Sequence, residues 1–102
     1  MKEVYLVYRM YHEHVYSTSR TENEDMVEKV FTTEDKAIDY ICERIERDHG
    51  YIDSIYPGDD NFTKYEPVRS DIRKSVAIDN WGMSDDYIIK RVSYRYESYD
   101  LE

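Results

Sequence analysis

One segment, Phe31 to Gly50, constrains the fold most because it has the pattern of a complete amphipathic helix. Thr32 is placed to cap its first turn, where Glu34 and Asp35 put negative charge at the positive end of the helix dipole. Gly50 is predicted to end the helix, since glycine readily takes the left-handed conformation that follows many helices. At about 100° per residue, five apolar side chains fall within an arc of roughly 140° and are predicted to pack on a sheet: Ala37, Ile38, Ile41, Cys42 and Ile45.

The same helix carries a row of acidic side chains. Four carboxylates fall within an arc of about 80°, three or four residues apart: Asp35, Asp39, Glu43 and Glu46. One interpretation is an ordinary solvated face that nearby arginines balance. The other is a row of charges presented to a basic partner, helped by acidic clusters elsewhere in the chain: Glu22, Glu24 and Asp25, and Asp59 and Asp60.

The overall charge limits the classes of partner. The 102 residues include 14 basic and 23 acidic side chains, for a net charge of −9. Direct binding of nucleic acid requires a basic surface, and an anionic membrane would repel this chain. A basic protein would instead be attracted to it. The length predicts a single domain, residues 1–102.

Composition favours a folded protein in a reducing compartment. Aromatic residues make up 15% of the chain, with 3 Gly and 2 Pro, whereas disordered chains are poor in aromatics. The single cysteine, Cys42, cannot form an internal disulfide and is expected to be a small core residue. The sequence shows no signal peptide and no apolar run long enough to span a membrane, so we expect a cytoplasmic location.

The first part of the chain indicates a β-β-α arrangement. Residues Glu3–Tyr11 alternate in the manner of a strand, and Met26–Phe31 form a second strand that leads into the helix. The polar run between them, His12–Asp25, is predicted to be a long hairpin connection. Such a start usually forms an antiparallel hairpin with the helix folded across one face.

The second part is less regular. Residues 51–56 fit either a helix end or a short extended piece, and Pro57-Gly58 fits the centre of a type II turn. Ser70 is placed to cap a second helix ending near Trp81-Gly82, although residues 76–78 also suit a strand. Residues 86–96 alternate as a final strand beside the first, followed by a short acidic tail, 97–102. The predicted fold is therefore α+β: a small antiparallel sheet, β-β-α-(α)-β, with one or two helices on one face.

Tyrosine is unusually frequent, with twelve in the chain. Seven of them concentrate in or beside the first and last strands: Tyr5, Tyr8, Tyr11, Tyr16, Tyr94, Tyr96 and Tyr99. Five of these are candidate interface residues: Tyr5, Tyr8, Tyr11, Tyr94 and Tyr96. Tyrosine is a good strand former whose ring helps to build a small core. It is also enriched at binding hot spots, so a tyrosine-bearing sheet face that the helix leaves uncovered could form a dimer or bind another protein.

Catalytic and metal-binding patterns are weak. His12 and His14 would share one face of a strand, at a spacing wide for joint metal binding, and His49 suits the C-terminal end of a helix. The chain has no glycine-rich phosphate loop and no nucleophile elbow, and Asp59-Asp60-Asn61 lacks the spacing of a calcium loop. We predict no catalytic residue, metal site or cofactor, and no enzymatic activity.

Three segments form a recurring combination: Val4-Tyr-Leu-Val-Tyr8, the helix start from Val30 to Ile41, and the late Tyr87-Ile-Ile. Together they resemble a group of small uncharacterised proteins from bacteriophages and Gram-positive bacteria. The resemblance implies a strand, a capped helix and a final strand, and it carries no activity. The size and charge are also similar to those of phage-encoded acidic inhibitors that imitate DNA.

Two functional hypotheses follow. The first is an acidic inhibitor or modulator, acting in the cytoplasm of a bacterial host, that presents carboxylates in place of DNA phosphates. Its partner would be a basic nucleic-acid-binding protein: a histone-like protein, a polymerase or a nuclease. The second is an assembly module that forms a dimer, or docks on another component, through a tyrosine-rich sheet face.

Overall fold

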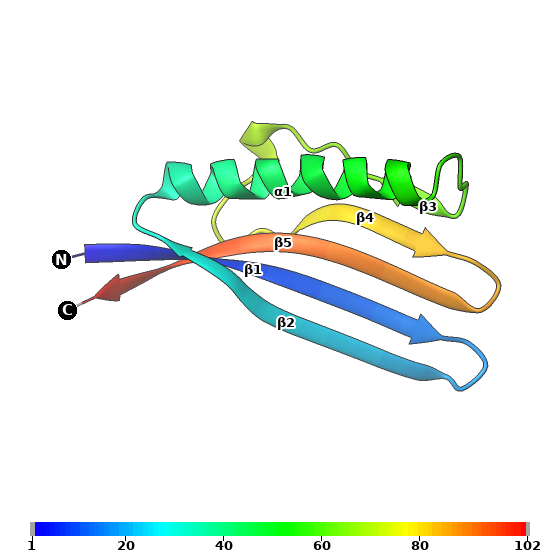
Figure 1. Ribbon diagram of the computed structural model, residues 1–102. Helices are drawn as coiled ribbons and strands as arrows, with labels where there is room; N and C mark the ends of the chain where they lie inside the picture. The colour runs from blue at the N-terminus through cyan, green and yellow to red at the C-terminus, as the bar shows by residue number, and fades with distance from the viewer. Residues whose placement is uncertain (1, 102) are drawn as a thin grey trace.

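A five-stranded antiparallel sheet with one long helix across one face forms the fold (Figure 1). This computed structural model describes residues 2–101. The elements are β1 (Lys2–Val15), β2 (Arg20–Phe31), α1 (Glu34–Ile55), β3 (Phe62–Lys64), the short 3-10 helix η1 (Arg69–Asp71), β4 (Ile78–Ser84) and β5 (Ile88–Leu101). The strand order is β2-β1-β5-β4-β3. The α+β class and the helix on one face are confirmed, but the strands dominate and α1 is the only α-helix within residues 2–101.

The first and last strands form the centre of the sheet. β1 and β5 pair antiparallel along their whole length, from Lys2 opposite Leu101 to Val15 opposite Ile88. The predicted pairing of these two strands is therefore confirmed. The predicted acidic tail is wrong for residues 97–101, because the backbone there continues to pair with β1; Glu102 lies outside the described residues.

The β1–β2 hairpin is much tighter than the sequence indicated. The predicted long connection over His12–Asp25 is wrong, since β1 reaches Val15 and β2 starts at Arg20. Polar side chains pair across the strands at this end: His12 Nδ1 lies 2.6 Å from Asn23 Oδ1, and His14 Nδ1 lies 2.7 Å from Thr21 Oγ1. Polar side chains are tolerated here because α1 does not reach over the tip of the hairpin (Figure 1).

Helix α1 begins one residue later than predicted and ends later. Thr33, not Thr32, is the N-cap, and its hydroxyl accepts a hydrogen bond from the Lys36 N–H at 3.3 Å. The predicted end at Gly50 is wrong, because the helix continues to Ile55. A glycine inside a helix costs only about 1 kcal/mol, and burial of Ile52 in the next turn, at 5% exposure, offsets that penalty.

The chain between α1 and β4 contains one predicted turn and lacks the predicted second helix. Gly58 has φ 70°, and the Asp59 N–H donates to the Tyr56 carbonyl at 3.2 Å, which confirms the turn at Pro57-Gly58. The helix predicted from Ser70 is wrong, since only η1 forms there. Ser75 takes φ 66°, and its N–H donates a hydrogen bond to the Tyr96 carbonyl. The backbone here is therefore bonded to β5 and does not form a helix.

The core lies between α1 and one face of the sheet. The predicted apolar face of the helix is confirmed, since its members are buried or pack against the core. The sheet side of the core comes from alternate residues of β1, β4 and β5: Val7, Ile78, Val92, Tyr94 and Tyr96. We call this side of the sheet the covered face and the opposite side the open face. Within residues 2–101, no helix is both long enough and apolar enough to cross a membrane.

Candidate functional site

The open face carries a group of large apolar side chains that no other element within residues 2–101 covers. Because side chains alternate along a strand, the neighbours of the buried Val7 in β1 point to the open face, together with their cross-strand partners in β2 and β5. Val27 and Val30 are 49% and 54% exposed. We call this group the open-face patch: Val4, Leu6, Tyr8, Met10, Val27, Val30, Tyr99 and Leu101.

A polar network crosses the patch and fixes the position of its aromatic rings. Arg95 donates to both carboxylate oxygens of Asp25, at 2.9 and 3.0 Å, and its guanidinium lies 4.2 Å from the centre of the Tyr8 ring. The Tyr8 and Tyr99 hydroxyls are 2.9 Å apart. The Tyr99 hydroxyl, then burial, raises the pKa of Tyr8, and hydrogen bonding to Asp25 raises the pKa of Arg95. The network therefore joins Tyr8, Tyr99, Arg95 and Asp25 into one connected set of contacts on the open face.

Next to the patch, the open face is hollowed. A depression of about 600 Å³ lies beside it, with walls that include Met10, His12, Asp79 and Arg91. The apolar patch and the polar depression thus form one continuous surface across four strands. Such a surface, apolar in one part and polar in the other, is typical of protein interfaces.

Most of the tyrosines predicted as an interface lie on the other face. Tyr94 and Tyr96 are 0% and 2% exposed beneath α1, and Tyr5 and Tyr11 pack against the same core. Burial, then a hydrogen bond to Glu13, raises the pKa of Tyr11 to about 12. Of the five, only Tyr8 lies on the open face.

The acidic row of α1 is partly neutralised within the chain. Arg69 of η1 pairs with Asp39 and lies 3.8 Å from Asp35, and Arg47 pairs with Glu43 at 2.7 Å. Within residues 2–101, Glu46 forms no ion pair. The row therefore presents less free charge than its sequence spacing indicates.

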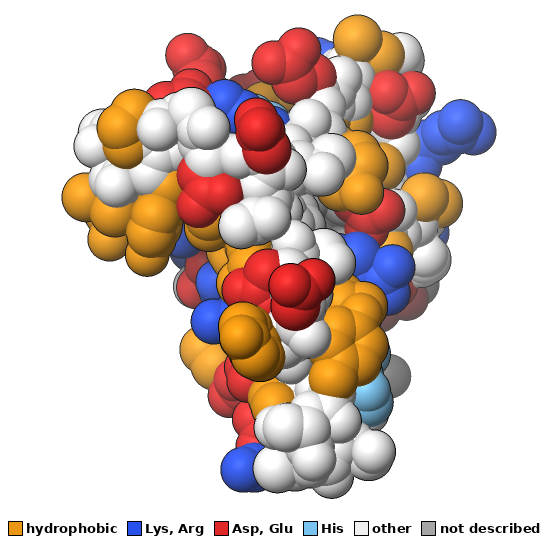
Figure 2. Space-filling model, turned by 90° about the vertical axis from the view of Figure 1, so that its right-hand side faces the viewer, with side chains coloured by type: hydrophobic (Ala, Val, Ile, Leu, Met, Phe, Trp, Pro, Cys, Tyr) orange, Lys and Arg blue, Asp and Glu red, His pale blue; other side chains and the backbone are white. Residues whose placement is uncertain are grey.

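The other predicted carboxylates do not join this row. Glu22 pairs with Arg20 and Asp25 with Arg95, while Asp59 accepts a hydrogen bond from the Asn61 N–H at 2.9 Å. Glu24 and Asp60 form no ion pair with any residue from 2 to 101. At the end of the molecule that holds the hairpin turns, acidic side chains are interspersed with apolar and basic ones (Figure 2).

One feature of the sequence indicates the open-face patch, although the tyrosine count does not reveal it. Strand β1 is apolar on both sides, with Leu6 and Met10 alternating with Val7, and this pattern is typical of a strand whose two faces both become covered. Because α1 covers only one face, the other remains free. Among residues 2–101, no three His, Cys, Asp or Glu side chains are placed to hold a metal ion.

Comparison with protein-family models, curated proteins and solved structures gives no significant match to this chain.

Proposed function

We propose that this chain is a binding protein that docks onto a basic nucleic-acid-binding protein through its open-face patch. It would inhibit or modulate that partner in the cytoplasm of a bacterial host. The observation that carries the proposal is the patch itself, where Val27, Val30, Tyr99 and Leu101 stay about half exposed. The chain is otherwise strongly polar, with a mean hydropathy of −0.88. Exposed apolar groups gathered on one face mark interaction surfaces.

The dimensions of the open face fit a stable interface. Its four strands have 14 residues each in β1 and β5, 12 in β2 and 7 in β4. At roughly 3.3 Å along and 4.8 Å across the sheet for each residue, the face covers roughly 740 Å². Stable protein interfaces bury about 800 Å² on each partner. The patch supplies the apolar centre, and the Arg95–Asp25 pair supplies a polar contact beside it.

Charge favours a basic partner over a second copy of the chain. Two molecules of net charge −9 repel each other, whereas a basic protein is drawn in by the same field. The carboxylates of the predicted set that form no ion pair within residues 2–101 lie on the helix side of the sheet or in the loop after α1, so they add to this long-range field: Glu24, Glu46, Asp59 and Asp60. On the open face itself, Asp25 and Asp79 border the depression beside the patch, and a basic partner would meet these carboxylates in place of DNA phosphates.

The same patch supports a second candidate, an assembly module that pairs two open faces. Sheets pack face to face through such apolar surfaces in β-sandwiches. Salt separates the two candidates. Screening weakens attraction to a basic partner, and it equally weakens repulsion between two copies. Partner binding should therefore fade as salt rises, whereas dimer formation should persist or increase.

The test is a displacement assay with purified proteins. The chain is titrated into complexes of a labelled DNA duplex with a histone-like protein, a nuclease or a polymerase, over a salt series. We expect release of DNA from at least one of them at low salt and loss of this effect at high salt. The double variant Leu6→Ser/Val30→Ser should compete poorly. Tyr87→Ser is the matched control, because Tyr87 is 74% exposed outside the patch.

Two results would contradict the proposal. One is that no protein of the panel releases DNA at low salt. The other is that the double variant competes as well as the unchanged chain and the Tyr87 control. Light scattering of the free protein then tests the second candidate, since a dimer that survives high salt and is lost in the double variant would establish the assembly module.

A further inference from the structure

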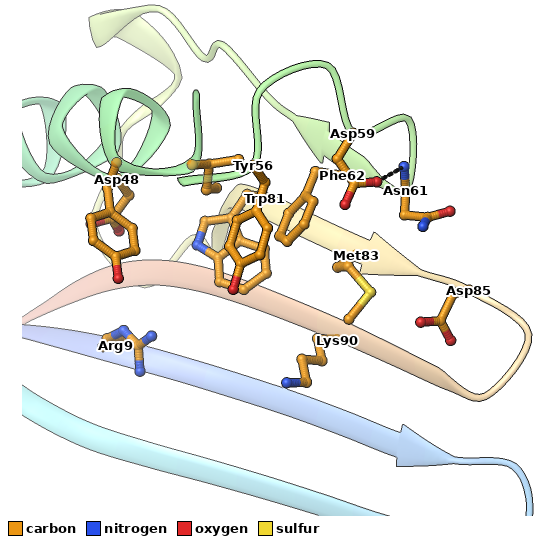
Figure 3. Close-up of a pocket in the computed structure, with 12 residues that line it drawn as sticks. Arg9, Asp48, Tyr56, Asp59, Asn61, Phe62, Trp81, Met83, Asp85 and Lys90 are labelled. Atoms are coloured by element: carbon orange, nitrogen blue, oxygen red, sulfur yellow. Dashed lines mark hydrogen bonds between the residues drawn. The ribbon is translucent and has the colours of Figure 1, made fainter. Parts of the chain in front are cut away.

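A second concave surface lies on the covered face, beyond the part of the sheet that α1 fills. It is a cleft of about 480 Å³, bounded by the last two turns of α1, the loop that follows, and strands β1, β4 and β5 (Figure 3). It forms because the sheet continues past the core toward the hairpin turns (Figure 1). Its size is in the range of small-molecule sites. We call it the aromatic cleft.

Three aromatic rings form one wall of this cleft. Tyr56 and Phe62 stack with ring centres 4.9 Å apart at 25°, and Phe62 lies 5.8 Å from Trp81 at 46°. The rings stand side by side above strands β4 and β5 (Figure 3). Ile52 and Met83 add apolar surface beside them. A planar ring entering the cleft would find π faces on which to stack.

Two cations line the cleft on either side of Trp81. Trp81 of β4 lies opposite Val92 of β5. On the same face of β5, Lys90 is two residues before Val92 and Tyr94 is two residues after it. Tyr94 in turn lies opposite Arg9 of β1. Both cationic side chains border the cavity. Neither forms an ion pair within residues 2–101.

The carboxylates near these cations are already bound to other groups. Asp48 accepts from the Asn80 amide at 2.7 Å and from the Tyr94 hydroxyl at 3.1 Å. Asp85 accepts from two backbone N–H groups of the β4–β5 turn, at 2.7 and 2.9 Å. Glu13, which lies opposite Lys90 in the sheet, accepts from the Tyr11 hydroxyl at 2.5 Å.

At the rim of the cleft, Asp59 is likewise bound, accepting from the Asn61 N–H (Figure 3). The acidic groups of the cleft thus have donors within the chain. None of these carboxylates forms an ion pair with Arg9 or Lys90, so the two positive charges are available to a bound anion.

We propose that the aromatic cleft binds a small planar aromatic anion, whose ring stacks on Trp81 and whose phosphate or carboxylate is held by Arg9 or Lys90. Nucleotides and aromatic carboxylates share this chemistry. Charge-assisted hydrogen bonds from Arg or Lys to an anion are strong and fix the orientation of the ligand, while stacking on an aromatic side chain tolerates different rings. The site is on the opposite side of the sheet from the open-face patch, so it stands independently of the proposed docking function.

Trp81 makes the proposal directly testable because it is the only tryptophan in the chain. The indole N–H signal in NMR spectra and the fluorescence emission both report on this one cleft. Four probes are titrated: a nucleoside monophosphate, benzoate, the uncharged nucleoside and inorganic phosphate. We expect a saturable change with one or both aromatic anions, and binding about ten-fold or more weaker for the uncharged nucleoside and for phosphate alone. Whichever anion binds more tightly identifies the source of the ligand.

Variants locate the anion. Arg9→Gln or Lys90→Gln should weaken binding about ten-fold and leave the weak response to the nucleoside unchanged. Arg91→Gln is the matched control, because Arg91 follows Lys90 but points to the open face. Circular dichroism verifies that each variant is folded. The proposal is overturned if neither anion gives a saturable change at millimolar concentration, if the nucleoside binds as tightly as its monophosphate, or if both cleft variants bind like the control.

Discussion

The two faces of the central strands hold their tyrosines in opposite ways. On the covered face, Tyr94 and Tyr96 are fully or almost fully buried beneath α1. On the open face, Tyr99 remains 47% exposed, although its hydroxyl bonds to that of Tyr8. Tyrosines of the same strand, β5, therefore belong partly to the core and partly to the surface. A high tyrosine content alone does not identify an interface, since the side of the sheet on which the helix lies decides each ring's role.

The largest expected difference between the faces is in stability. Tyr94→Ala should lower the free energy of unfolding by about 3–5 kcal/mol, because it leaves a cavity under α1. Tyr99→Ala should lower it by about 1 kcal/mol or less, because its ring is half in solvent. Urea denaturation of both variants measures the difference. Equal losses would show that the open face is as important to folding as the core.

A smaller effect on stability is expected from strengthening α1, the helix that covers one face of the sheet. Gly50→Ala should raise the free energy of unfolding by about 0.5–1 kcal/mol, because Gly50 lies inside α1 and an added Cβ meets nothing within 4 Å. Gly58→Ala is the control and should destabilise the chain, since Gly58 has φ 70°. If Gly50→Ala is destabilising in the same assay, the last turns of α1 are not helical in solution.

The last expected effect is a pH dependence to which Tyr11 on the covered face contributes. The pKa of Tyr11 is raised from 10.0 to about 12 in the folded chain. Between these values the unfolded chain loses the proton while the folded chain keeps it, so the contribution of Tyr11 to stability is lost as pH rises from 10 to 12. Tyr11→Phe should reduce the slope of unfolding free energy against pH in this range. An unchanged slope would show that Tyr11 titrates alike in both states.

Local patterns predicted those parts of the fold that local forces determine. The apolar arc of α1 followed from helical spacing, and the Pro57-Gly58 turn followed from backbone preferences. The final strand could be placed beside the first because both alternate in period two. The end of α1 was missed because burial of Ile52, a tertiary contact, outweighs the weak helix propensity of Gly50.

The candidate sites depend on contacts that sequence patterns do not contain. β1 is apolar on both sides, so nothing local determined which of Leu6 and Val7 would face the helix. Arg9, Trp81 and Lys90 come from three strands, and only their register brings them to one cleft. The ion pair of Arg69 with Asp39 joins residues far apart in sequence and could not be foreseen from the helix alone.

The pairing of β1 with β5 also determines when the protein can acquire its structure during synthesis. The innermost strand pair joins residues from opposite ends of the described chain, Lys2 with Leu101. Until β5 is made, the edge of β1 that pairs with it has no partner strand. Contacts of such long sequence separation slow folding and expose edges to aggregation. We therefore expect the completed sheet to form only after β5 has left the ribosome.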